Sequence, residues 1–191
     1  MNSVDCIKRK IEEILEKSSI PEDPIHSKNT LKWLLRLMPD ADDALKIAAL
    51  GHDIERAIEE RKAMKTDYKN YEEFKDAHAL NSAKILIELM KECNASKELL
   101  DDVFFLVAHH EKGGNKRAEA LKNADTISFF DVNLPLYYAR NDVEETKKRF
   151  LWGYKKLPKN LQETVAKFNY KDKRLQSLVR TWITEVQEKS A

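Results

Sequence analysis

Apolar residues recur at spacings of three and four along most of this chain, and they seldom alternate with polar residues. A spacing of three and four places apolar side chains on one side of a helix, whereas alternation is typical of a strand. The chain also contains only 4 Gly and 5 Pro, the residues that most often interrupt helices. The pattern therefore predicts an all-α fold without a convincing strand.

The first third of the chain divides into helices at polar and proline-containing segments. A first apolar stripe ends before Ser18, and a loop at residues 21–24 leads into His26. Ser27 follows that loop directly and is the expected N-cap of the second helix, because its hydroxyl can accept from a free backbone N–H. This second helix is predicted to stop at Pro39.

Asp40 is the expected N-cap of a third helix, whose apolar residues precede His52 and Asp53. The His52-Asp53 pair is therefore predicted to lie late on a buried helix. Gly113 and Gly114 are typical of a helix stop. One further helix is expected to start near Tyr71, another to end at 109–111, and a third to start at about Lys116. Three more are expected over roughly 142–157, 159–168 and 172–188. The basic and aromatic run 147–156 is interpreted as an amphipathic helix that packs Phe150, Leu151 and Tyr154 on the core, the alternative being a single-strand nucleic-acid groove.

Length and charge narrow the class of protein. The 191 residues fit one domain, or a core domain with a helical extension, and predict one cooperative unit. With 34 Lys+Arg against 33 Asp+Glu, no global attraction to nucleic acid or to an anionic membrane is expected. Neither a signal peptide nor a membrane span is predicted. Cys6 and Cys93 form no CxxC pair, so we expect neither a disulfide framework nor a zinc ribbon, and a reduced, cytoplasmic compartment.

The candidate chemistry lies in the histidines. The chain has five, and together with two aspartates they occur in the order His26, His52-Asp53, His78, His109-His110, Asp125. Neutral imidazole and carboxylate suit first-row transition metals, and seven such groups are enough for two ions. Taken singly, each residue is more simply a capping, core or surface side chain. Taken together, they predict a metal site.

Helix geometry adds detail to this prediction. Neighbouring helical residues point about 100° apart, so His52 and Asp53 can straddle one or two points beside their helix, and Asp53 suits a bridging role. His109 and His110 lie near a helix end, where a loosened backbone would let both rings converge on one ion.

The order of these residues resembles the HD-domain superfamily of metal-dependent phosphohydrolases, whose signature H…HD…D is matched by His26, His52, Asp53 and Asp125. The resemblance covers about residues 20–135 and implies a metal-binding helical core there, with 136–191 as an extension of the same domain. The remaining residues His78, His109 and His110 resemble the binuclear branches, among them the HD-GYP cyclic-dinucleotide phosphodiesterases. That resemblance implies a first metal held by His26, His52, Asp53 and Asp125, a second held by His78, His109 and His110, and Asp53 bridging the two.

Departures from related patterns narrow the substrate. Residues 111–115 are not followed by a Gly-Tyr-Pro element, which counts against cyclic dinucleotides. Arg56 stands four positions after His52, where some nucleotidases have Glu, and the acidic pair typical of alarmone hydrolases is missing. The remaining prediction is hydrolysis of a nucleotide or another small phosphoester.

The resulting prediction is a metal-dependent phosphohydrolase with two divalent ions chosen among Fe, Mn, Ni, Co and Zn. Ions about 3.5–4 Å apart would activate a water and clamp phosphoryl oxygens. The expected catalytic residues are His52, Asp53, Glu111 and Lys112, and the expected substrate-binding residues are Arg56, Lys112, Lys116, Arg117 and Lys122. A di-iron oxygenase and a metal-stabilised binding module without turnover stay open as alternatives. The expected partner is a small phosphoester rather than nucleic acid or a membrane, and a homo-oligomer is compatible with the sequence.

Overall fold

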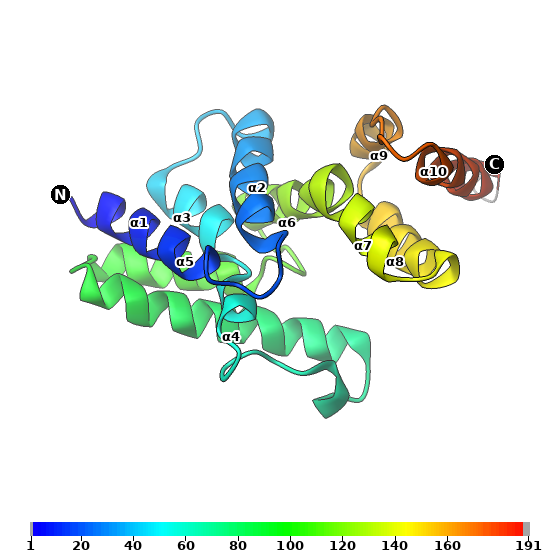
Figure 1. Ribbon diagram of the computed structural model, residues 1–191. Coiled ribbons are helices and arrows are strands. Elements are labelled where there is room, and N and C mark those ends of the chain that lie inside the picture. The colour runs from blue at the N-terminus through cyan, green and yellow to red at the C-terminus, as the bar shows by residue number, and fades with distance from the viewer. Residues whose placement is uncertain (1, 189–191) are drawn as a thin grey trace. The chain divides into compact units, whose positions relative to one another are not determined.

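The structure is a computed structural model that describes residues 2–188, and within that range it contains ten α-helices and no strand (Figure 1). The all-α prediction is confirmed. None of the helices in the described range combines the length and apolar character that crossing a bilayer requires.

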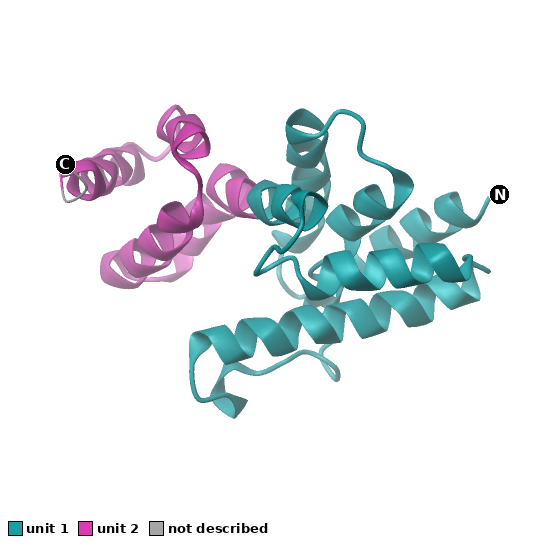
Figure 2. Cartoon of the chain, turned by 180° about the vertical axis from the view of Figure 1, so that it is seen from behind, with its two compact units in different colours: residues 1–125 teal, residues 126–191 magenta. Residues whose placement is uncertain are grey.

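The chain forms two compact units, residues 1–125 and residues 126–191 (Figure 2). The sequence predicted a single domain with a core at about 20–135 and a helical extension. This stays a prediction, because two compact units can belong to one domain. The boundary lies inside one helix, α6, directly after Asp125. No loop or change of composition marks that position, and for this reason the sequence offered no signal for it.

Unit 1, defined as residues 1–125, is built around a buried helix. Its elements are α1 (Ser3–Leu15), α2 (Asp23–Leu37), α3 (Asp43–Gly51), η1 (Ile54–Ala57), η2 (Lys65–Asp67), α4 (Tyr71–Glu92), α5 (Lys97–Ala108) and most of α6 (Lys116–Ser128). Helices α4 and α5 pack along each other, and α3 packs against α1, α2 and α5. At the end of α3, Gly51 lies so close to Leu86 that an added Cβ would be 2.8 Å from its Cδ2. The glycine thereby brings the following residue, His52, into the interior.

Two predicted helix starts are wrong. Helix α2 begins at Asp23 and has a proline in its first turn. Proline is tolerated there because the first N–H groups of a helix have no helical partner. Ser27 is therefore inside the helix, and its hydroxyl donates to the Leu50 carbonyl at 2.6 Å. The cap of α3 is Asp42 rather than Asp40, since its carboxylate accepts from Leu45 N at 2.9 Å. His52 is the C-cap of α3, and Asp53 lies just beyond the helix.

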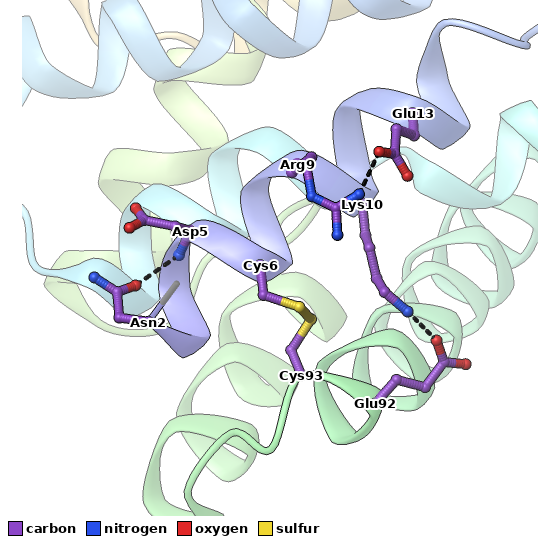
Figure 3. Close-up of a disulfide and its surroundings, with 8 residues drawn as sticks. All are labelled: Asn2, Asp5, Cys6, Arg9, Lys10, Glu13, Glu92 and Cys93. Atoms are coloured by element: carbon purple, nitrogen blue, oxygen red, sulfur yellow. Dashed lines mark hydrogen bonds and ion pairs between the residues drawn. A yellow bond between two sulfur atoms is a disulfide. The ribbon is translucent and has the colours of Figure 1, made fainter.

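The prediction about the cysteines is also wrong, because Cys6 and Cys93 form a disulfide (Figure 3). Helix α1 packs against α4 through buried apolar residues, and this packing brings the two Cα atoms to 5.8 Å. An ion pair between Lys10 and Glu92 lies beside the bridge. The two cysteines are 87 residues apart in sequence, so only the packing of α1 on α4 reveals the pair.

Unit 2, defined as residues 126–191 and described to residue 188, has an aromatic core. It contains the end of α6, a π-helical turn η3 (Phe129–Asn133), α7 (Leu134–Arg140), α8 (Val143–Lys156), α9 (Lys159–Ala166) and α10 (Lys173–Glu188). The last three helices confirm the predicted ranges. Helix α7 was missed because Pro135 was interpreted as a helix breaker. In the structure Pro135 lies in the first turn of α7, where proline is tolerated. Phe150 and Tyr154 are buried as predicted, whereas Leu151 is half-buried.

Candidate metal centre

Six of the seven predicted ligands converge inside unit 1 from separate elements. His26 lies in the first turn of α2, His52 and Asp53 at the end of α3, and His78 in α4. The set is completed by His110, just after α5, and by Asp125 in α6. All four histidines of the set are buried, with at most 3% of their surface exposed.

One group of potential ligands consists of His26, His52 and Asp125, whose ligand atoms all lie within 4.8 Å of one another. The Nε2 atoms of the two histidines are 3.2 Å apart. Asp125 Oδ1 lies 2.9 Å from His26 Nε2 and 3.4 Å from His52 Nε2. Two imidazole nitrogens and a carboxylate oxygen therefore face one point, which is the arrangement that a transition-metal ion accepts.

A second group consists of Asp53, His78 and His110. Asp53 Oδ1 lies 2.8 Å from His78 Nε2 and 3.7 Å from His110 Nε2. The same oxygen is 3.7 Å from His52 Nε2, which belongs to the first group. Asp53 thus joins the two groups, and this position is compatible with the bridging role predicted from the sequence.

Backbone and carboxylate acceptors orient the rings. His52 Nδ1 donates to the Ala49 carbonyl at 3.0 Å, and His110 Nδ1 donates to the Val107 carbonyl at 2.7 Å. His78 Nδ1 lies 2.7 Å from Glu55 Oε1. Because the outer nitrogen of each ring carries the proton for these contacts, the Nε2 atoms point inward as ligands, as in known metal sites.

The electrostatics of the cluster are those of a cation site. Burial would lower the pKa of His52, but the carboxylates of Asp53 and Asp125 outweigh burial and raise that pKa to about 9. Burial would raise the pKa of Asp53, but His52 and His78 hold that pKa well below the usual range. The buried carboxylates thus attract positive charge, whether a proton or a metal ion supplies it.

His110 supplies an independent test of whether metal fits. Its side chain is fully buried, and its Nε2 has no hydrogen-bond partner among the described residues. The nearest oxygens are Glu111 Oε1 at 3.4 Å and Asp53 Oδ1 at 3.7 Å. Native structures rarely leave a buried polar atom unpaired, so such an atom needs an explanation. A cation between His110 Nε2 and these oxygens would provide one.

The structure does not bring His109 into any of these groups. Its Nδ1 donates to the Phe105 carbonyl at 2.8 Å, and its ring stacks on Phe105 at 4.2 Å. Consecutive residues point in different directions, and here only His110 points inward. The next residue, Glu111, instead forms a third group of potential ligands with His110 and Asp125.

The other predicted residues vary in their surroundings. Arg56 lies at the cluster, where its two terminal nitrogens are each 3.0 Å from a carboxylate, one of Asp53 and one of Asp23. Lys112, which is 62% exposed, pairs with Asp76 at 2.6 Å. Arg117 pairs with Asp42 and Asp102.

Lys122 and Lys116 complete the predicted substrate-binding set. Lys122 pairs with Glu119 at 2.6 Å on its own helix, and Lys116 is exposed. The carboxylates that Lys112 and Arg117 contact are not candidate ligands. The substrate-binding role of these basic residues stays a prediction.

Three residues of the centre were missed from the sequence. Asp23 and Glu55 are buried carboxylates that contact Arg56 and His78 respectively. Burial raises the pKa of Asp23, and Arg56 counteracts this effect. Lys75 forms an ion pair with Glu111. Helical spacing was the available signal for Lys75, because it precedes His78 by three residues on the same helix face.

Comparison with known proteins assigns a family. The model of a family described as "Domain of unknown function (DUF4202)" matches residues 2–179. This match covers most of the chain, so the protein belongs to that family. No curated protein and no solved structure shows significant similarity to it.

Proposed function

We propose that this member of the DUF4202 family is a metal-dependent phosphohydrolase of the HD-domain type, acting on a nucleotide or another small phosphoester. One observation carries the proposal. Inward-facing Nε2 atoms from four helical segments surround Asp53 and Asp125, and one of them, on His110, has no protein partner. The order of these residues along the chain, H…HD…H…H…D, is the pattern that resembles the HD superfamily.

The chain offers ligands for two divalent ions. His26, His52 and Asp125 would hold the first, with Asp53 beside them. Asp53, His78 and His110 would hold the second, and Glu111 groups with His110 and Asp125. Such ions polarise phosphoryl oxygens and lower the pKa of water toward neutrality. Arg56 contacts Oδ2 of Asp53 at 3.0 Å and thereby keeps Oδ1 directed toward His78.

Charge favours an anionic substrate. The buried or half-buried carboxylates in and beside the cluster are those of Glu22, Asp23, Asp53, Glu55, Glu111 and Asp125. Arg56 and Lys75 are the basic side chains that pair with them. With neutral histidines these side chains carry an excess of negative charge, and two divalent ions would offset it. The ions themselves would bind phosphate oxygens.

The experiment begins with the metal content of the purified protein. The metal-loaded protein is then assayed with Mn, Ni, Co or Fe against a panel of nucleotides and sugar phosphates, with phosphate release as the readout. H110A should bind metal at least about tenfold more weakly and lose activity. H109A is the matched control, because the adjacent ring stacks on Phe105, and it should retain both.

The other outcomes separate the alternatives. A wild-type protein that binds metal but releases no phosphate from any substrate would rule out the hydrolase. Oxygen uptake by the iron-loaded protein would then support the di-iron oxygenase. Inactivity in both assays would support a binding module.

A further inference from the structure

Lys75 is a charged residue placed inside the candidate centre without an obvious role in packing. It lies on α4, and its ammonium pairs with the carboxylate of Glu111. Its side chain is 14% exposed and that of Glu111 is 9% exposed. Lysine is seldom buried to this extent unless it is paired, because removing its charge from water is costly.

Its surroundings are those of the metal ligands. Glu111 Oε1, the oxygen that Lys75 contacts, is also 3.4 Å from the unpartnered Nε2 of His110. The carboxylates of Asp53 and Asp125 act on Lys75 as well and, with Glu111, raise its pKa against the effect of burial. The ammonium is therefore a fixed positive charge at the edge of the cluster.

This ammonium retains capacity for another partner. An ammonium has three N–H donors, and the ion pair recorded for Lys75 is the one with Glu111. Arg56, the other basic group of the centre, already spans Asp23 and Asp53 with its two terminal nitrogens. The side chain of Lys75 keeps 14% of its surface exposed, so the residue is not sealed in the interior.

We propose that Lys75 is the anion-binding residue of this centre and that it takes a phosphoryl oxygen of the substrate beside the metal ligands. The naming of a phosphoester rests on the proposed function. The same geometry serves free inorganic phosphate, which is the simplest probe of the site.

The alternative is that Lys75 only neutralises Glu111 and supports the fold. The two roles predict opposite changes in metal affinity when Lys75 is replaced. An anion-binding lysine repels the cations that Glu111, His110 and Asp125 would hold. Its neutralisation should therefore strengthen metal binding and weaken phosphate binding. A purely structural lysine should weaken both when it is replaced.

The test uses K75Q, K75R and K84M in the full chain. Glutamine keeps a donor for Glu111 and removes the charge, arginine keeps the charge, and Lys84 is an exposed lysine on the same helix. Calorimetry first measures Mn²⁺ affinity and then the affinity of the Mn²⁺-loaded protein for inorganic phosphate. K75Q should bind phosphate at least about tenfold more weakly, since a charge-assisted hydrogen bond is lost, with Mn²⁺ affinity equal or higher. K75R and K84M should stay within about threefold of wild type.

A second measurement needs no variant and covers the case in which K75Q does not fold. In the wild-type protein, phosphate should slow reductive methylation of Lys75 and leave that of Lys84 unchanged. Unchanged phosphate affinity in K75Q, a joint loss of Mn²⁺ and phosphate affinity, or no protection would each overturn the proposal. Phosphate binding through Lys75 without turnover of any substrate would leave the proposal standing and remove the proposed function instead.

Discussion

The two units bury different kinds of polar residue. In unit 1 the buried polar residues include eight titratable side chains: Glu22, Asp23, His26, His52, Asp53, Glu55, His78 and His110. In the described part of unit 2 they are the neutral Ser128, Asn133, Thr146 and Gln176, beside an aromatic core. Burying charged side chains costs more free energy than burying neutral ones. The difference places the candidate metal centre in unit 1, whereas the core of unit 2 consists of apolar, aromatic and neutral polar side chains.

The hydrogen bonding of the two units sharpens this contrast. In unit 2, Thr146 donates to the Asp142 carbonyl at 2.7 Å, and Gln176 accepts from Tyr170 N at 2.7 Å. In unit 1, by contrast, the inward Nε2 of His110 lacks a hydrogen-bond partner in the described chain. Unit 2 thus satisfies Thr146 and Gln176, but it leaves Asn133 Oδ1 without a hydrogen-bond partner among the residues described. The difference lies in the surroundings of the unpaired atom, because His110 Nε2 faces the carboxylates of the candidate centre.

The largest expected effect is the loss of Asp53, the carboxylate that joins the two ligand groups. In D53N we expect kcat/KM to fall at least about a thousandfold, because charge stabilisation worth several kcal/mol is lost. Bound metal should fall as well, as measured by elemental analysis. D101N, at an exposed position of α5, is the control and should retain both. Full metal content in D53N would contradict the joining role.

The next largest effect is expected from a substitution that creates a cavity in the core of unit 2. Phe150 is fully buried and contacts Phe130, Tyr154 and Trp182. F150A should lower the free energy of unfolding by about 3–5 kcal/mol in denaturant titrations. Metal affinity of the folded variant should stay unchanged, since the candidate ligands all belong to unit 1. A weaker metal affinity in folded F150A would show that metal binding depends on the core of unit 2. Coincident loss of both units would support the predicted single cooperative unit.

The disulfide of unit 1 should contribute somewhat less. We expect C6S/C93S to lower the free energy of unfolding by about 2–5 kcal/mol, because the bridge closes a long loop in the unfolded chain. The same loss should follow when wild type is measured with a thiol reductant. As a control, the reductant should leave the stability of C6S/C93S itself unchanged. Equal stability of the reduced and oxidised wild type would show that packing alone holds α1 on α4.

The smallest effect is a pH dependence that belongs to unit 1. The folded pKa of His52 is raised to about 9, above its ordinary value near 6.5. Its contribution to stability without metal is therefore complete below about pH 6.5 and is lost as pH rises through about 9. For Asp53 the pKa is lowered, so its contribution is lost only as strong acid protonates it.

Metal must displace the proton on His52, so binding near neutral pH should release about one proton from this ring. Apparent metal affinity should rise up to about tenfold per pH unit until about pH 9. Calorimetry in buffers of different ionisation enthalpy measures this release. Proton release that is the same in H52Q and in wild type would assign the proton to another group.

Local sequence determined much of this protein. The spacing of apolar residues and the glycine stops predicted the helical class and most helix ranges, because both depend on neighbours within a few residues. The order of histidines and aspartates, through its resemblance to the HD pattern, predicted six of the residues that meet. Tertiary structure decided what depends on how the helices pack: that His110 rather than His109 points inward, that Lys75 pairs with Glu111, and that Cys6 reaches Cys93. Side-chain direction and pairing across the chain are set by how helices pack, and no local spacing encodes that packing.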